Sequence, residues 1–366
     1  MADLVLHGGV VHTQDPERPR AQAAAIRDGR FVAVGSDEEA FAALPHAKRV
    51  DLAGRCLVPG FNDAHMHLWK IGHMLTSLVD LRGVRSMKEL TDALRAHARD
   101  YDSPWIVGRG YNEAQLAERR SPTRDDLDAA LPDRAIFLTR TCGHIGVASS
   151  KALEVAHVGP DTAAPSGGAI ERDATGRPTG VLHETAMGLV NGRIEESSAS
   201  EYEEMVTAAA RKLLPKGITS VTDAGVTPRL LSVYRAMEVA GEMPLRVNAM
   251  ALRRTLSGGA TLPLPERSVS PWLRIDSVKL LVDGGLSGAT AALSCCYRHS
   301  DSTGLLRLGG DELYQLALEA HRVGLRVGAH AIGDRAIDEV LDAYVKLTAS
   351  QPDPAPRIEH FGLPSA

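Results

Sequence analysis

The sequence predicts an α/β protein built on a parallel sheet, arranged either as a barrel or as a doubly wound sheet. Strand-like apolar runs alternate with stretches whose apolar residues recur at helical spacing, which is the pattern of repeated βαβ units. Aromatic residues make up only 4% of the chain, and its many small apolar residues suit close packing of helices on such a sheet. Histidines and a lysine stand near the ends of several runs, where barrels carry their sites.

A small β module is expected before the main fold, over residues 1–55. Short β-rich runs separated by Gly-Gly and Asp-Gly occupy residues 3–11, 21–27 and 30–34. The Asp28-Gly29 pair is a typical turn of a two-residue hairpin. A chain of 366 residues has room for such a module and for a barrel of about 250 residues over 56–366.

Six strands are expected in the main fold. The first leads into His65, and the others are residues 219–225, 245–252, 275–284, 325–332 and 356–362. Helical spacing of apolar residues lies between most of them, at Tyr202, Val206, Ala209 and Leu213, at Leu313, Leu316, Ala317 and Ala320, and at Ile337, Val340, Leu341 and Tyr344. Residues 101–198 break this rhythm with Gly and Pro, and we interpret them as an irregular insertion that shapes a pocket.

Two histidines separated by one residue end the first strand, in the stretch LVPGFNDAHMHLW. Side chains two apart on a strand share a face, so the imidazoles of His65 and His67 could converge on one metal ion. With 14 histidines in the chain, roughly 0.5 such pairs are expected by chance, so the pair alone decides nothing.

Three further candidate ligands follow from strand periodicity. In IDSVKLLVDG the period of two puts Lys279 and Asp283 on the face opposite Val278 and Leu280, which in a barrel is the interior. His330 lies opposite Val327 and Ala329 in the next strand, and His360 ends the last one. Taken alone, Lys279 would be read as a solvent-reaching lysine and His330 as a core histidine. Five such residues near the carboxyl ends of four strands favour a shared metal site.

Composition excludes several other classes. The chain has 41 Lys plus Arg against 46 Asp plus Glu, with both signs scattered, so we expect no nucleic-acid partner. No run approaches the roughly 18 apolar residues of a membrane span, and the N-terminus lacks the pattern of a signal peptide. Four cysteines without metal-knuckle or disulfide spacing favour a reducing compartment. We therefore expect a cytoplasmic protein with a small-molecule substrate and no membrane contact, and homo-oligomerisation stays open.

The stretch PGFNDAHMHLW resembles the first-strand signature of the amidohydrolase superfamily. The chain as a whole is similar to its amidohydrolase-3 or YtcJ-like branch, through GRGYNEAQL, GRPTGVLHETA, GITSVTDAG, VKLLVDGGLSGATAAL, HAIGDRAI and RIEH, in that order. This branch includes N-substituted formamide deformylase and relatives that cleave amide or other C–N bonds. The resemblance implies a distorted (β/α)8 TIM barrel of the metal-dependent hydrolase type, a flanking β-sandwich to which residues 1–55 contribute, and one or two divalent metal ions, usually zinc.

Carried onto this sequence, the resemblance gives each candidate ligand a role. His65 and His67 would bind one ion, and His330 and His360 the second. Lys279 would bridge them as a carboxylated lysine, because an ammonium has no lone pair to offer a cation. Metal-activated hydroxide would then attack a carbonyl carbon.

The resemblance ends before the family pattern does. The family places an aspartate that shuttles the proton at the end of an eighth strand, and this sequence stops four residues beyond RIEHFG. The catalytic acid or base therefore stays unassigned, and we expect a barrel truncated after strand six. Asp223, Asp283 and Asp334 are expected to serve in structural hydrogen bonds.

Four residues are candidates for substrate contact or for support of the ligands. His144 matches a family histidine that lines the pocket, although a buried structural histidine is an equal interpretation. Asp63 could orient a ligating histidine or serve only in the turn after Pro-Gly. Tyr111 stands where the family usually has Trp, and Asp283 lies on the same strand face as Lys279.

The leading functional hypothesis is a metal-dependent amidohydrolase that acts on an amide, formamide or related C–N bond. A cyclic amidase or deaminase of the same superfamily is a second interpretation. A third is a metal-binding but catalytically inactive fragment that lacks the strand-eight aspartate.

Overall fold

The computed structural model describes residues 3–101, 103–165, 168–255, 260–286, 289–298, 301–352 and 355–365. The chain divides into two compact units. The small unit comprises Met1–Asn62 with Gly217–Ser220, and the large unit comprises Asp63–Lys216 with Val221–Ala366. None of the helices in the described part of the chain is long and apolar enough to span a lipid bilayer.

The small unit is built from two short sheets and one helix. One sheet has the order β5-β4-β1-β6, with β1 at Leu4–His7, β4 at Ala23–Arg27, β5 at Arg30–Gly35 and β6 at Lys48–Asp51. The other has the order β3-β2-β7, with β2 at Val10–His12, β3 at Arg20–Ala21 and β7 at Cys56–Leu57. Helix α1 spans Asp37–Ala43 and begins at a capping box formed by Ser36 and Glu39.

The hairpin predicted at Asp28-Gly29 is confirmed. Strands β4 and β5 pair antiparallel, and Arg27 stands opposite Arg30. The two turn residues have φ of 49° and 73°, the positive values that a type I′ turn requires.

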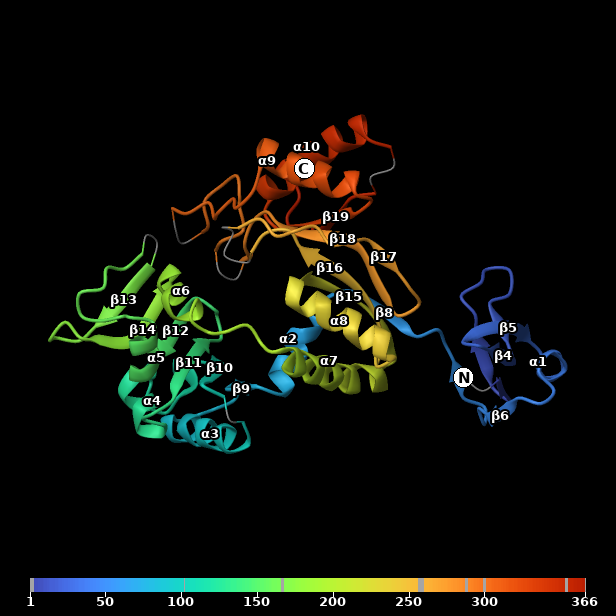
Figure 1. The fold of residues 1–366 in the computed structure, drawn as a ribbon, viewed down its shortest axis with the longest axis horizontal. Helices are drawn as coiled ribbons and strands as arrows, with labels where there is room; N and C mark the ends of the chain where they lie inside the picture. The colour runs from blue at the N-terminus through green and yellow to red at the C-terminus, as the bar shows by residue number, and fades with distance from the viewer. Residues whose placement is uncertain are drawn as a thin grey trace. The chain divides into compact units, whose positions relative to one another are not determined.

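The six strands expected in the main fold form one sheet in the order β8-β15-β16-β18-β19-β20 (Figure 1). Their bounds are Phe61–Met66, Ile218–Val226, Arg246–Leu252, Leu273–Leu281, Arg326–Ala331 and Arg357–His360, and β17 at Ser268–Val269 pairs with β18. Strand β18 runs parallel to β16 and β19, and β20 runs parallel to β19. The edge strands also meet, because Arg357 of β20 donates to the carbonyl of Ala64 in β8 at 2.7 Å. The strands thus form a nearly closed parallel barrel.

Helices cover this sheet as the apolar spacing predicts. Their bounds are α2 at Leu68–Leu75, α7 at Ala199–Leu213, α8 at Pro228–Ala240, α9 at Gly310–Arg322 and α10 at Asp334–Ser350. Helices α9 and α10 pack on Val278, Leu280 and Val327, which form one core cluster with them (Figure 1). The prediction was wrong for Leu341, which is 42% exposed because the buried stripe of α10 runs through Ile337 and its helical neighbours instead.

Residues 101–198 are regular, contrary to the expected irregular stretch, and their role as an insertion that shapes a pocket stays a prediction. Much of residues 101–198, with the segment before it, forms a six-stranded sheet in the order β13-β14-β12-β11-β10-β9. Its strands are β9 at Leu78–Asp80, β10 at Trp105–Tyr111, β11 at Ala135–Arg140, β12 at Ile145–Ala148, β13 at Gly168–Arg172 and β14 at Pro178–Glu184. Its helices are α3 at Met87–Asp100, α4 at Arg124–Ala130, α5 at Ser150–Val155 and α6 at Gly188–Asn191. Single 3-10 turns lie at Glu113–Gln115, Thr185–Met187 and Leu214–Lys216.

Burial explains why the sequence pattern did not predict this sheet. Residues 135–138 of β11 are buried one after another, so the strand has no polar face and no period of two. Strands β10 and β14 of the same sheet contain glycines at positive φ, Gly110 at 106° and Gly180 at 97°, which resemble loop breaks in the sequence.

Close packing of α2 on α7 gives a first prediction. A Cβ on Gly72 would lie 1.9 Å from the carbonyl oxygen and 2.5 Å from the Cα of Met205, and these backbone atoms cannot turn aside. We expect Gly72→Ala to lower the free energy of unfolding by about 1–3 kcal/mol, measured from the urea midpoint. The control is Gly188→Ala at the start of α6, where the added Cβ meets nothing within 4 Å and stability should not fall. An equal loss in both variants would contradict the prediction.

Candidate metal centre

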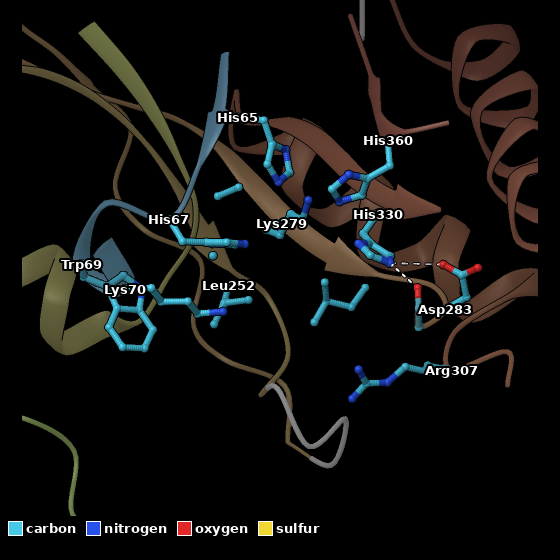
Figure 2. Close-up of a pocket in the computed structure, with 14 residues that line it drawn as sticks. His65, His67, Trp69, Lys70, Leu252, Lys279, Asp283, Arg307, His330 and His360 are labelled. Carbon is cyan, nitrogen blue, oxygen red and sulfur yellow. Dashed lines mark hydrogen bonds and ion pairs between the residues drawn. The ribbon is translucent and has the colours of Figure 1, made fainter. Parts of the chain in front are cut away.

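All five predicted ligands line one pocket of about 270 Å³ in the large unit (Figure 2). They are His65, His67, Lys279, His330 and His360. These residues come from β8, from the start of α2, and from β18, β19 and β20, so the barrel brings together positions up to 295 residues apart, the difference between 65 and 360. The five candidate ligands predicted from the sequence therefore lie around one pocket.

His65 and His67 stand at the junction of β8 and α2. His65 lies in the strand, whereas His67 is the N-cap residue of α2 with φ −121° and ψ 87°. Their ring centroids are 5.7 Å apart. Burial lowers the pKa of His67 to about 4, helped by the positive charge of Lys70, so its imidazole is neutral at pH 7. Its Nδ1 is buried and accepts or donates no hydrogen bond within the described ranges of the chain.

Lys279 lies in β18 and is only 2% exposed. Its Nζ has no hydrogen-bond partner among the residues that the structure describes. Burial lowers the pKa of the amine to about 8, although Glu359 raises it in part. A buried amine without a partner is costly, and a pKa near 8 makes the neutral, nucleophilic form readily available. These are the properties that carboxylation by carbon dioxide requires.

His330 and His360 complete the set. Their ring centroids are 4.7 Å apart, and the ring of His360 lies 4.6 Å from that of His65. His330 points its Nε2 at the carbonyl of Gly284, 2.8 Å away. Burial lowers the pKa of His360 to about 4, and neighbouring imidazoles add to the effect. His360 also has φ of 72°, a strained value that non-glycine residues keep mainly at functional sites.

Asp283 supports the loop beyond β18. Its carboxylate accepts backbone N–H groups of Ala292, Ile332 and Gly333 at 3.0, 3.1 and 2.9 Å, and its Oδ1 lies 3.3 Å from Nε2 of His330 (Figure 2). Burial raises the pKa of Asp283, but these donors outweigh burial and leave the pKa below its usual value. The carboxylate is therefore held in place, as a structural role predicts.

The other two aspartates considered for catalysis are also engaged. Asp223 accepts the hydroxyl of Tyr234 at 2.6 Å and is fully buried, which raises its pKa to about 6. Asp334 accepts the backbone N–H of Ser294 at 2.9 Å. Both contacts agree with the expected structural roles.

Asp63 accepts the backbone N–H of His65 at 3.1 Å. This is a local turn contact, and within the described residues Asp63 makes no hydrogen bond to an imidazole ring. Tyr111 is fully buried in β10, and burial raises its pKa above the usual range. His144 bonds Glu184 at 2.9 Å. No residue of 101–198 is among the described residues that line this pocket, so substrate contact by Tyr111 or His144 stays a prediction.

Glu359 is a functional candidate that the sequence reasoning missed. It is 2% exposed, and its Oε2 bonds Nδ1 of His65. Arg357 pairs with the same carboxylate and donates from Nη2 to Oε2 at 2.9 Å. Burial raises the pKa of Glu359, but the bonds from His65 and Arg357 outweigh it and bring the pKa to about 2. The only sequence signal was the alternation of Arg357 and Glu359 in RIEH.

The nitrogen atoms of the five candidate ligands suit a divalent cation chemically, although their arrangement is not a complete coordination site. Among the described residues, no group of three or more His, Cys, Asp or Glu side chains is arranged to hold a metal ion as it stands. The neutral imidazoles of His67 and His360 nevertheless offer lone pairs. Two buried nitrogens, Nδ1 of His67 and Nζ of Lys279, lack a hydrogen-bond partner in the described part of the chain, and a ligand would supply one.

The buried amine makes stability depend on pH in a defined direction. The pKa of Lys279 is about 8 in the folded chain, against 10.5 for an unperturbed lysine, so between these values the unfolded chain binds more protons. We expect the free energy of unfolding of metal-free protein to rise by up to about 3 kcal/mol from pH 8 to 10.5. Urea midpoints in a chelator measure the rise. Lys279→Met should flatten it, and an unchanged slope in that variant would contradict the assignment.

Comparisons with known proteins show what the chain as a whole is similar to. The model of the amidohydrolase family matches residues 48–363. YtcJ of Bacillus subtilis strain 168 is 31% identical over 353 residues, which cover 93% of this chain and 66% of YtcJ. N-substituted formamide deformylase of Arthrobacter pascens is 31% identical over 377 residues, which cover 98% of this chain and 69% of that enzyme.

A solved structure shares both fold and sequence. It is an uncharacterized metal-dependent hydrolase from Pyrococcus furiosus, with a TM-score of 0.79 and 29% identity over 97% of this chain and 72% of that chain. The chain thus spans about two thirds of the length of these relatives, slightly less for YtcJ. Sequence match, fold and pocket lead to one conclusion: the chain belongs to the amidohydrolase family.

Proposed function

We propose that the protein is a metal-dependent hydrolase of C–N bonds, acting on an amide or formamide. The observation that carries this proposal is the convergence of four imidazoles and one buried, unpartnered amine on a single pocket. The family match supports hydrolysis, and the similarity to a formamide deformylase supports the type of bond.

His65 and His67 would hold one ion, and His330 and His360 a second. Imidazole nitrogen suits zinc among the common divalent metals. Lys279 would join both sites after its neutral amine adds carbon dioxide, forming an N–C bond and releasing one proton to water. The carbamate is an anionic oxygen ligand, which the ammonium form cannot be. When bound, the ion would polarise the substrate carbonyl and lower the pKa of water.

The chain's own residues orient these ligands. Glu359 accepts from Nδ1 of His65, which leaves Nε2 of that ring for the pocket. Gly284 and Asp283 fix Nε2 of His330 in the same way and leave its Nδ1. We assign no residue of this chain as the proton donor to the leaving amine, because Asp223, Asp283 and Asp334 are all engaged in structural bonds.

Metal analysis combined with a hydrolysis assay tests the proposal. The chain and a version extended to the length of its relatives would be loaded with Zn²⁺ and assayed for amine release from N-benzylformamide and a cyclic amide. Stoichiometric zinc and turnover that a chelator abolishes are expected in at least the extended version. His330→Ala should lose both, whereas His321→Ala in α9, outside the pocket, should lose neither. Metal without any turnover in the extended version would favour a silent metal-binding protein.

A further inference from the structure

A second cavity lies in the large unit and takes no part in the site described above. It measures about 260 Å³, close to the volume of the metal pocket, and no described residue lines both. Its lining comes from α2 and α3, from the start of β10, from residues 194–198 and from the first turns of α7 and α8. A cavity of this size is at the small end of the range for ligand sites, so its ligand must be small.

Aromatic rings and uncharged imidazoles form one part of this lining. The ring of Tyr101 stacks on His97, with centroids 4.8 Å apart and an interplanar angle of 12°, and the half-buried Trp105 is a further lining residue. Burial lowers the pKa of His97 and of His73, so both imidazoles are neutral at pH 7. Such a lining accepts an apolar group, and the face of an indole also attracts a cation.

Carboxylates outnumber cations among the described residues of this lining. Glu195, Glu196 and Glu201 are acidic, whereas Arg229 is the only lysine or arginine in that set. The guanidinium of Arg229 donates to the main-chain carbonyl of Glu196 at 3.0 Å rather than to a carboxylate. Glu195 and Glu196 are exposed and Glu201 is half-buried, so solvent screens part of the negative charge but does not cancel it. The cavity therefore favours a positively charged ligand.

Two of these carboxylates keep an oxygen available for a ligand. Oε1 of Glu196 accepts two hydroxyl groups, at 3.2 and 2.6 Å, and Oε2 of Glu201 accepts the backbone N–H and the hydroxyl of Ser198, both at 2.7 Å. The other oxygen of each carboxylate accepts no hydrogen bond from a described residue. The hydroxyl oxygen of Ser77, which also lines the cavity, is buried and has no hydrogen-bond partner in the described ranges. An ammonium group has three N–H donors and no acceptor, which suits a set of free oxygens.

We propose that this cavity binds a small primary ammonium ion, with the apolar part of the ligand against Trp105 and its charge near Glu196 and Glu201. An alkylamine is protonated at neutral pH, and hydrolysis of a C–N bond releases an amine. The amine product is therefore a ligand of this class, an identification that rests on the proposed function. Binding itself requires neither metal nor turnover, so it can be measured on the metal-free protein.

Benzylamine and benzyl alcohol separate charge from shape, because they differ only in an ammonium and a hydroxyl group. Calorimetry on the metal-free protein at pH 7 should show benzylamine binding roughly 10-fold more tightly than the alcohol, through two partly exposed carboxylates and the indole face. Glu196→Gln and Glu201→Gln should each weaken benzylamine binding by roughly 2–5-fold, and the double variant by roughly 10-fold, without changing the affinity for the alcohol. Glutamine at position 201 can still complete the capping box with Ser198, so α7 should stay intact.

Two further variants serve as references. Trp105→Leu should weaken the binding of both compounds, because it removes the apolar contact that they share. Glu154→Gln should change neither affinity, because Glu154 lies on α5, is not among the lining residues and pairs with Lys151 at 3.0 Å.

The outcomes distinguish this site from the proposed function. Equal affinities for the amine and the alcohol, no benzylamine binding, or benzylamine binding that survives the double carboxylate substitution would overturn the ammonium site, whatever the hydrolysis assay shows. Benzylamine binding that depends on the two carboxylates, without turnover of N-benzylformamide by the zinc-loaded extended protein, would overturn the proposed function and leave the ammonium site intact.

Discussion

Replacing Lys279 with methionine is expected to abolish hydrolysis while stabilising the metal-free fold. Methionine fills similar space in β18 but cannot add carbon dioxide or offer an anionic ligand. Activity should fall by more than the roughly 10–100-fold that loss of an outer-shell partner causes. Stability should rise by about 1–3 kcal/mol, because the variant removes a buried amine that has no hydrogen-bond partner.

The experiment is decisive because the variant is expected to lose activity and to gain stability. Urea unfolding in a chelator and kcat/KM with added metal would be measured on the same preparations. A matched control is Lys346→Met in α10, an exposed lysine whose salt bridge to Asp311 spans 3.3 Å and whose loss should change both quantities little. A variant that loses both stability and activity would indicate that Lys279 has an unrecognised structural partner, which would contradict the role given to it.

Glu359→Gln is expected to weaken metal binding by roughly 10–100-fold without unfolding the protein. The carboxylate holds Nδ1 of His65 and pairs with Arg357, which in turn donates to the Ala64 carbonyl and joins β20 to β8. Glutamine keeps the shape but loses the charge that fixes the tautomer of His65. The imidazole would then present its free nitrogen to the pocket for a smaller fraction of the time.

Competition with a coloured chelator measures this affinity directly, independent of turnover. Glu171→Gln is the matched control, because Glu171 pairs with His183 at 3.7 Å on β13 and β14, outside the pocket. Metal affinity should be unchanged in that control. An unchanged affinity in Glu359→Gln would show that the contact with His65 does not orient a ligand.

Periodicity and strand ends predicted the barrel strands and the five candidate ligands that line the pocket, whose binding of metal stays a prediction. Strand β18 shows why: Val278 and Leu280 pack under α9 and α10, while Lys279 lies on the pocket side, as the period of two requires. Each ligand stands at or near the end of a strand, and parallel strands bring those ends together. The imidazole rings of His65 and His360 lie close together because of this topology, although no local sequence pattern connects the two residues.

Other features of the structure had no sequence pattern that could predict them. Strand β11 is buried on both faces, so its sequence lacks the alternation that marks a strand. Glu359 contacts an imidazole almost 300 positions away, at residue 65, where β8 and β20 meet. Long-range contacts of this kind are set by topology rather than by local pattern.

A crystal structure of the zinc-loaded protein, with anomalous data at the zinc edge, tests the central claim most directly. The account predicts anomalous density within about 2.0–2.1 Å of imidazole nitrogens from His65, His67, His330 and His360. It also predicts additional density joined to Nζ of Lys279. Zinc bound elsewhere, or a pocket that stays free of metal at saturating zinc while Lys279 remains an unmodified amine, would contradict it.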